Sequence, residues 1–239
     1  MRGSLLNGQA VTASSSRRRV LEWMGGASAL ALLSACSVSL PGSGSPPRIF
    51  VLTPKSTFDE GLPSVDWQLL VETPQAAAGI ASSRIALRRS SIELQYFSRA
   101  AWTDSAPKMV QNLMIESFEN SGKIISVGRQ AIGLSADFIM KSDLREFQAE
   151  YVDENGMPLP EGSAPNIRIR LNTKLVKMPD RRIVGSRTFE YFLPAPGPTM
   201  IEVVAGFDAV LGKVLKRAVS WTLLEGDRID RESADDNAA

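Results

Sequence analysis

The only cysteine of the 239-residue chain, Cys36, ends a short apolar segment, and this arrangement decides which residues can enter a fold. The basic block Arg17–Arg19 precedes an apolar run from residue 23 to residue 33. That run is about half the length that a membrane-spanning helix needs. A basic block, a short apolar core and small residues after it are typical of a secretory signal peptide. We therefore predict that residues 1–35 are removed and take no part in the fold.

The segment Leu33-Ser34-Ala35-Cys36 resembles the bacterial lipobox, whose cysteine receives a diacylglyceryl group and becomes the new N-terminus. We expect Cys36 to carry the lipid, with palmitate among its acyl chains, and to anchor the chain to a membrane. In well-studied Gram-negative bacteria, an aspartate at the next position retains lipoproteins in the inner membrane. By this resemblance Ser37 indicates the outer membrane, with the domain facing the periplasm. An ordinary signal peptide with a chance cysteine is the alternative, and export by the Sec or the twin-arginine route stays open.

The composition of residues 36–239 limits the partners and the covalent links that the mature chain can have. Cleavage before Cys36 removes four arginines and one glutamate, which changes the formal net charge from +1 to −2. No basic excess remains that would favour nucleic acid as a partner. With Cys36 lipidated, no thiol is left for a disulfide, so packing alone must hold a domain of ordinary size together.

The absence of histidine excludes most catalytic arrangements. It removes the usual general base, the nucleophile–histidine pairs and histidine-based zinc sites. The sequence has no phosphate-binding loop, no dinucleotide fingerprint and no metal-ligand spacing. We therefore predict a protein that is not an enzyme and that needs no cofactor and no metal. Chemistry that uses only carboxylates, as in glycosidases, stays open.

The chain divides into a tether, a folded domain and a tail. Residues 36–47 are rich in serine, glycine and proline, and we expect them to form a tether that spans about 18 Å if flexible. The apolar periodicity runs through residues 48–224, which we predict to be one domain. Residues 225–239 are acidic and nearly free of apolar side chains, so we expect a disordered tail.

The periodicity within the domain predicts about eight strands and two helices. The clearest alternation of apolar and polar residues runs from Ile167 to Leu175. A change of phase before Phe147 predicts a β-bulge near Arg145 and Glu146. One helix should end at Gly122, and the other should begin at a capping box formed by residues 199–202. Two helices are too few to cover both faces of such a sheet. We therefore predict a two-layer α+β fold, with a mostly antiparallel sheet and both helices on one face.

The polar face of the strand at residues 167–175 carries the candidate binding residues. Arg168, Arg170 and Lys174 alternate with the apolar side chains, and Arg182 follows in the next strand. Such cations could bind a lipid phosphate or an acidic partner surface. A solvated strand face without a binding role is the alternative.

Several ordered segments resemble the ABC-type transport auxiliary lipoprotein family. The resemblance is carried by the segments Arg84-Ile-Ala-Leu-Arg88, Trp102-Thr-Asp-Ser-Ala-Pro107, Phe118-Glu-Asn-Ser-Gly122, Asp137–Phe147 and Ala205–Trp221. It covers most of the predicted domain, and the lipobox lies where that family has one. The resemblance implies a lipoprotein that accompanies an ABC permease, an ATPase and an MCE-domain subunit. Such systems move lipids between the inner and outer membranes.

Three functions follow from these observations. The first is a non-enzymatic auxiliary lipoprotein of an MCE-type lipid transporter, with phospholipid as a further candidate partner. The second is a structural or assembly lipoprotein of the outer membrane without a transport role. The third is a carboxylate-dependent hydrolase, which would need a deep cleft holding two carboxylates. Assembly into a homo-oligomer stays open.

Overall fold

The computed structural model describes residues 46–129 and 136–238. The predicted signal peptide, Cys36 and Ser37 lie outside the described residues. The end of the predicted tether, Pro46 and Pro47, is exposed and has no regular secondary structure. From Pro46 onward the chain forms one compact unit.

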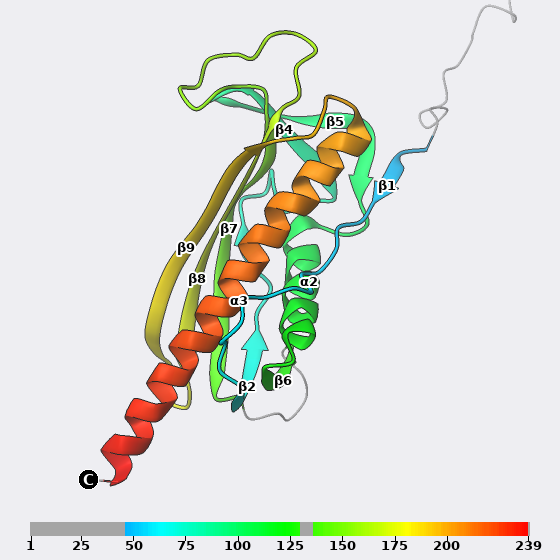
Figure 1. Cartoon of the computed structure of the whole chain (residues 1–239). Coiled ribbons are helices and arrows are strands. Elements are labelled where there is room, and N and C mark those ends of the chain that lie inside the picture. The colour runs from blue at the N-terminus through cyan, green and yellow to red at the C-terminus, as the bar shows by residue number, and fades with distance from the viewer. Residues whose placement is uncertain (1–45, 130–135, 239) are drawn as a thin grey trace, which may run out of the picture. The chain divides into compact units, whose positions relative to one another are not determined.

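Strand β7 (Phe138–Glu150) is the spine of a nine-stranded mixed sheet (Figure 1). Along one edge it pairs over its whole length, antiparallel, with β8 (Asn166–Lys177). Strand β8 in turn pairs antiparallel with β9 (Arg182–Pro194) after a turn at residues 178–181. These three long strands therefore follow each other in space as they do in the sequence.

The other edge of β7 is occupied by three short strands, one after another. Each pairs with β7 in the parallel direction: β2 (Val65–Val71), β3 (Gln75–Ala76) and β4 (Arg84–Ser90). The sheet is extended beyond them by β6 (Ile124–Gly128) on β2, by β5 (Glu93–Trp102) on β4 and by β1 (Arg48–Phe50) on β5. The β4–β5 pair is the antiparallel hairpin that the sequence predicted.

The predicted bulge in β7 is confirmed. The register between β7 and β8 shifts between Leu144 and Glu146, so that Arg145 has no partner opposite it. A bulge adds one residue to one strand, so each residue after it points to the face of the sheet opposite to the one that strict alternation would give. Leu144 and Phe147 therefore both point into the core, although they are three residues apart, and each is 1% exposed.

Helix α2 (Ala106–Ser121) begins and ends near the predicted residues. Pro107 lies in its first turn, and Gly122 ends it in the left-handed conformation at φ 60°. No side-chain hydrogen bond from Ser105 caps its N-terminus. The Asp104 carboxylate instead accepts a hydrogen bond from the Ser105 N–H at 2.7 Å and pairs with Lys108 at 2.9 Å.

Helix α3 (Met200–Ala238) begins at the predicted capping box. The Thr199 N–H donates to Glu202 Oε2 at 3.0 Å, and the Glu202 N–H points back to Thr199 Oγ1 at 3.4 Å. Hydrogen bonds from the hydroxyl and the backbone of Thr199 lower the pKa of the Glu202 carboxyl below its ordinary value. This pair satisfies two of the backbone donors that a helix start leaves open.

The prediction of a disordered tail after residue 224 is wrong, because α3 continues to Ala238. Charged residues of opposite sign stand four apart here, and Arg228 pairs with Glu232 at 2.6 Å. Ile229 is 8% exposed and belongs to the core. Gly226 packs so tightly that a Cβ atom on it would lie 2.4 Å from Trp67 Cζ2. Helical ion pairs and packing on the sheet side therefore order a segment that its composition alone would leave unfolded.

Both helices cover one face of the sheet, which confirms the predicted α+β class. Helix α3 contacts β8 and β9, α2 contacts β2 and β6, and the helices touch each other (Figure 1). The rings of Trp102, Phe147 and Phe207 meet in the core between these layers, with centroids 5.1 to 5.8 Å apart. Neither of the two described helices covers the opposite face of β7 and β8, which carries Arg168, Arg170 and Lys174. Arg182 stands opposite Lys177, which bonds to Ser233 of α3, so it lies on the helix side.

Candidate functional site

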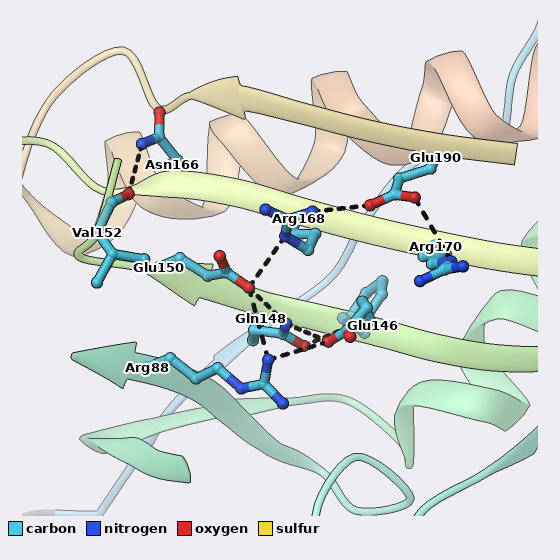
Figure 2. Close-up of polar contacts among 10 residues, drawn as sticks. Arg88, Glu146, Gln148, Glu150, Val152, Asn166, Arg168, Arg170 and Glu190 are labelled. Atoms are coloured by element: carbon cyan, nitrogen blue, oxygen red, sulfur yellow. Dashed lines mark hydrogen bonds and ion pairs between the residues drawn. The ribbon is translucent and has the colours of Figure 1, made fainter. Parts of the chain in front are cut away.

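A network of charged side chains lies on the open face of the sheet, and Glu150 is at its centre (Figure 2). The Glu150 side chain is only 6% exposed. Its carboxylate accepts hydrogen bonds from Gln148 Nε2 at 2.8 Å and from Arg168 Nε at 3.1 Å. Arg88 Nη1 approaches from β4 at 3.9 Å. A buried charge of this kind is tolerated only when such partners surround it.

Gln148 connects this network to the bulge. Its side-chain oxygen accepts a hydrogen bond from the Phe147 N–H at 2.8 Å, just after the register shift. Its amide nitrogen donates to Glu146 as well as to Glu150. One fully buried amide thus satisfies a backbone donor at the bulge and holds two carboxylates at fixed positions.

Arg168 lies between two carboxylates rather than in water. Besides Glu150 it binds Glu190 of β9 at 2.8 Å, and its guanidinium stacks on the Phe192 ring at 4.2 Å. Burial lowers the pKa of Arg168, but the charge of Glu150 and the hydrogen bonds that Arg168 donates to Glu190 and Glu150 outweigh it, so the pKa is raised. The side chain is 27% exposed. The expectation of a solvated cation at this position is therefore wrong.

Of the other predicted binding residues, only Arg170 lies near Arg168, because both contact the Glu190 carboxylate. Arg170 Nε lies 3.4 Å from Glu190, and Lys174 Nζ lies 3.9 Å from Asp143. Arg182 is exposed and pairs in register with Lys177, nine residues along β8 from Arg168. That distance is about 30 Å in an extended strand. The open face therefore presents partnered charges spread along a strand and does not form one cationic site.

A second charged surface lies on the helix side of the sheet, in a groove between α3 and β9. We call it the α3–β9 groove, and its volume is about 660 Å³. Its charged lining consists of five cations, Arg187, Lys213, Lys216, Arg217 and Arg228, and two carboxylates, Asp59 and Glu225. Tyr191, Ser220, Trp221 and Leu224 complete the lining. Positive charge thus prevails in this hollow.

The two carboxylates of the groove neutralise only two of its cations. Lys216 pairs with Asp59, and Arg228 pairs with Glu225 at 2.7 Å. The remaining three cations, Arg187, Lys213 and Arg217, form no ion pair with any residue that the structure describes. The α3–β9 groove is therefore suited to an anion, in contrast to the neutralised network on the open face.

Aromatic side chains fix the shape of the groove. Trp221 packs against Phe189 with ring centroids 5.9 Å apart. Lys213 Nζ lies 5.9 Å from the centre of the Tyr191 ring, and Arg217 donates a 3.4 Å hydrogen bond to the Tyr191 hydroxyl. These contacts place Lys213 over the Tyr191 ring and Arg217 at its hydroxyl.

Sequence reasoning missed this groove. Lys213, Lys216 and Arg217 stand at helical spacing and could have been placed on one face of a helix. Nothing in the sequence indicated that Arg187 and Tyr191 would lie opposite that face.

The described residues show no arrangement suited to metal chemistry. Within residues 46–129 and 136–238, no group of three or more acidic, histidine or cysteine side chains could hold a metal ion. Both carboxylates of the α3–β9 groove are engaged by cations.

Within residues 46–129 and 136–238, neither helix is apolar over a length that would cross a bilayer.

Comparisons with known proteins agree on one family. A family model described as the ABC-type transport auxiliary lipoprotein component matches residues 50–219. A solved protein from Xanthomonas campestris, described under the family model DUF330, is 34% identical, with a TM-score of 0.70 over 77% of this chain and 99% of that one. A solved uncharacterized protein shares the fold at 14% identity and a TM-score of 0.50, over 79% and 99%.

A curated relative matches part of the chain. It is an uncharacterized protein of Bradyrhizobium diazoefficiens, 28% identical over 128 residues. The match covers 54% of this chain, and it spans about a third, 32%, of the relative's own length.

Proposed function

Because the chain belongs to the ABC-type transport auxiliary lipoprotein family, as its sequence predicted, we propose that it serves a transporter that moves lipids between two membranes. Its partners would be an ABC permease, an ATPase and an MCE-domain subunit. The observation that carries this proposal is the family match, which spans residues 50–219 and so most of the described fold. The chain would contribute binding surfaces to the transporter and no catalytic residue.

The proposed location is the outer membrane, with the domain facing the periplasm. Lipidation of Cys36 would supply the anchor, because a lipobox cysteine carries more than one acyl chain and stable anchoring needs at least two. Residues 36–47 would tether a domain that begins near residue 48. In this arrangement the folded domain can reach a partner while its N-terminal end stays attached to the membrane.

The test is purification of the whole tagged chain from native membranes in a mild detergent. We expect an MCE-domain subunit and an ABC permease to be recovered with it, and mass spectrometry would identify them. A matched preparation of the Cys36→Ala chain controls for contaminants of the membrane fraction. Recovery of only an outer-membrane assembly component would contradict the transport role and favour the structural alternative.

A further inference from the structure

We propose that the α3–β9 groove binds the phosphate-bearing headgroup of an anionic glycerophospholipid. This inference deepens the proposed function and rests on it for the choice of a lipid as the source of the phosphate. The site itself rests on charge, shape and polarity within the described residues.

The excess of positive charge in the groove favours binding of an anion. Arg187 from β9 and Arg217 from α3 line it from two elements, and Lys213 adds a third cation without a carboxylate partner among the described residues. Elsewhere on this sheet the charges of Arg168 and Lys174 are matched by acidic neighbours. The groove thus brings three cations without a carboxylate partner into one hollow, whereas Arg168 and Lys174 each lie beside an acidic side chain.

The geometry suits a phosphate group. Guanidinium groups bind phosphate oxygens through two parallel hydrogen bonds, and a lysine ammonium adds a point charge. Ser220 lines the groove, and its hydroxyl has no hydrogen-bond partner among the described residues. A volume of about 660 Å³ is within the range of small-molecule sites and can hold a headgroup.

Apolar surface beside the cations favours a lipid over a free phosphate ion. Trp221 and Tyr191 form part of the wall, and Leu224 is 52% exposed at the groove. Gly185 lets the Trp221 ring pack directly on the backbone of β9, because a Cβ atom at this position would lie 3.0 Å from Trp221 Cζ2. A phospholipid presents a phosphate next to a glycerol backbone and acyl chains, so it can use both kinds of surface. An inorganic phosphate ion would use only the cations.

The experiment measures binding of soluble short-chain lipids to the whole lipidated protein in a non-ionic detergent. The probes are dihexanoyl phosphatidylglycerol, dihexanoyl phosphatidylcholine and inorganic phosphate. Calorimetry at low and at high salt measures how tightly each probe binds. We expect saturable binding of phosphatidylglycerol that weakens with salt, and weaker binding of the other two. The variant Lys213→Glu/Arg217→Glu should bind phosphatidylglycerol at least about tenfold more weakly, since it replaces two cationic hydrogen-bond donors by carboxylates that repel the phosphate.

A charge-matched variant controls for the loss of general attraction. Arg48→Glu/Lys123→Glu makes the same change in net charge at residues outside the groove lining, and it should bind phosphatidylglycerol as the wild type does. Thermal unfolding of both variants verifies that they fold. Equal affinity of the wild type and the groove variant, or equal loss in both variants, would overturn the site. Inorganic phosphate that binds as tightly as the lipid would overturn the choice of a lipid.

The outcome separates this inference from the proposed function. If lipid binding fails while the wild type still co-purifies with an MCE-domain subunit, the groove assignment falls and the auxiliary role stands. If the lipid binds in the groove but no transporter subunit is ever recovered, the proposed function falls and the binding site stands.

Discussion

Replacing Arg168 by alanine tests whether the network on the open face holds the sheet together. The change removes the 3.1 Å contact to Glu150 and the 2.8 Å contact to Glu190, and it leaves Arg88 and Gln148 near the buried carboxylate. Removing one partner of a buried ion pair costs about 3–5 kcal/mol. Because two partners of Glu150 remain, we expect a loss of about 2–3 kcal/mol in the free energy of unfolding.

Arg170→Ala is the matched control. It lies on the same strand and the same face, but it is 40% exposed and its one ion pair spans 3.4 Å. An exposed pair contributes less than about 1 kcal/mol, so this variant should stay close to the wild type. Adding Glu150→Gln to Arg168→Ala should restore part of the loss, because a neutral amide no longer needs a counter-charge.

Urea unfolding of the full chain in a Cys36→Ala background, followed by tryptophan fluorescence and circular dichroism, would measure these differences. Two results would refute the reasoning. One is that Arg168→Ala destabilises no more than Arg170→Ala. The other is that the loss from Glu150→Gln simply adds to the loss from Arg168→Ala.

Four further predictions address helix α3, the lipid anchor and the sorting signal. Gly226→Ala should lower the melting temperature, because the Trp67 ring already occupies the place of the new methyl group. Gly212→Ala is the control: the nearest atom to its new Cβ lies 4.0 Å away, so this variant should raise the free energy of unfolding by about 0.5–1 kcal/mol through helix propensity. The pKa of Glu202 is lower in the folded chain than its unfolded-state pKa of about 4.5, so the ionised carboxylate stabilises the fold above pH 4.5. The free energy of unfolding of the wild type should exceed that of Glu202→Gln at neutral pH, and this difference should vanish as the pH falls through the folded-state pKa. Cys36→Ala should abolish lipidation, seen as a mass change and loss from membranes, and unchanged mass would contradict it. Ser37→Asp should move the protein from outer to inner membranes in density gradients.

Local features of the fold could be predicted because their causes lie within a few residues. The alternation in β8, the bulge before Phe147 and the capping box at Thr199 each leave a pattern in the sequence itself. The helical end of the chain was missed for a related reason. Its acidic composition hid the pairing of Arg228 and Arg231 with carboxylates three or four residues away. The packing of Ile229 and Gly226 against the rest of the domain is a tertiary contact that the composition does not reveal.

The charged surfaces could not be predicted because they depend on long-range register. The sequence placed Arg168 and Arg170 on one face of a strand, and that placement is right. It did not reveal that β7 would set Glu150 and Glu146 beside them, since that depends on the register in which β7 pairs with β8. The α3–β9 groove joins Arg187 to Arg217 across two elements, and their separate patterns carry no sign of that contact.

The position of β7 also sets an order of assembly. Strands β2, β3 and β4 all form hydrogen bonds with β7, although they precede it in the chain. A polypeptide that emerges from a translocation channel N-terminus first must therefore hold these strands without their main partner until residue 150 has passed. The β7–β8–β9 ladders, in contrast, join neighbours in sequence and can close as soon as each strand appears. The first half of the domain thus stays without its main partner strand while the second half is still arriving.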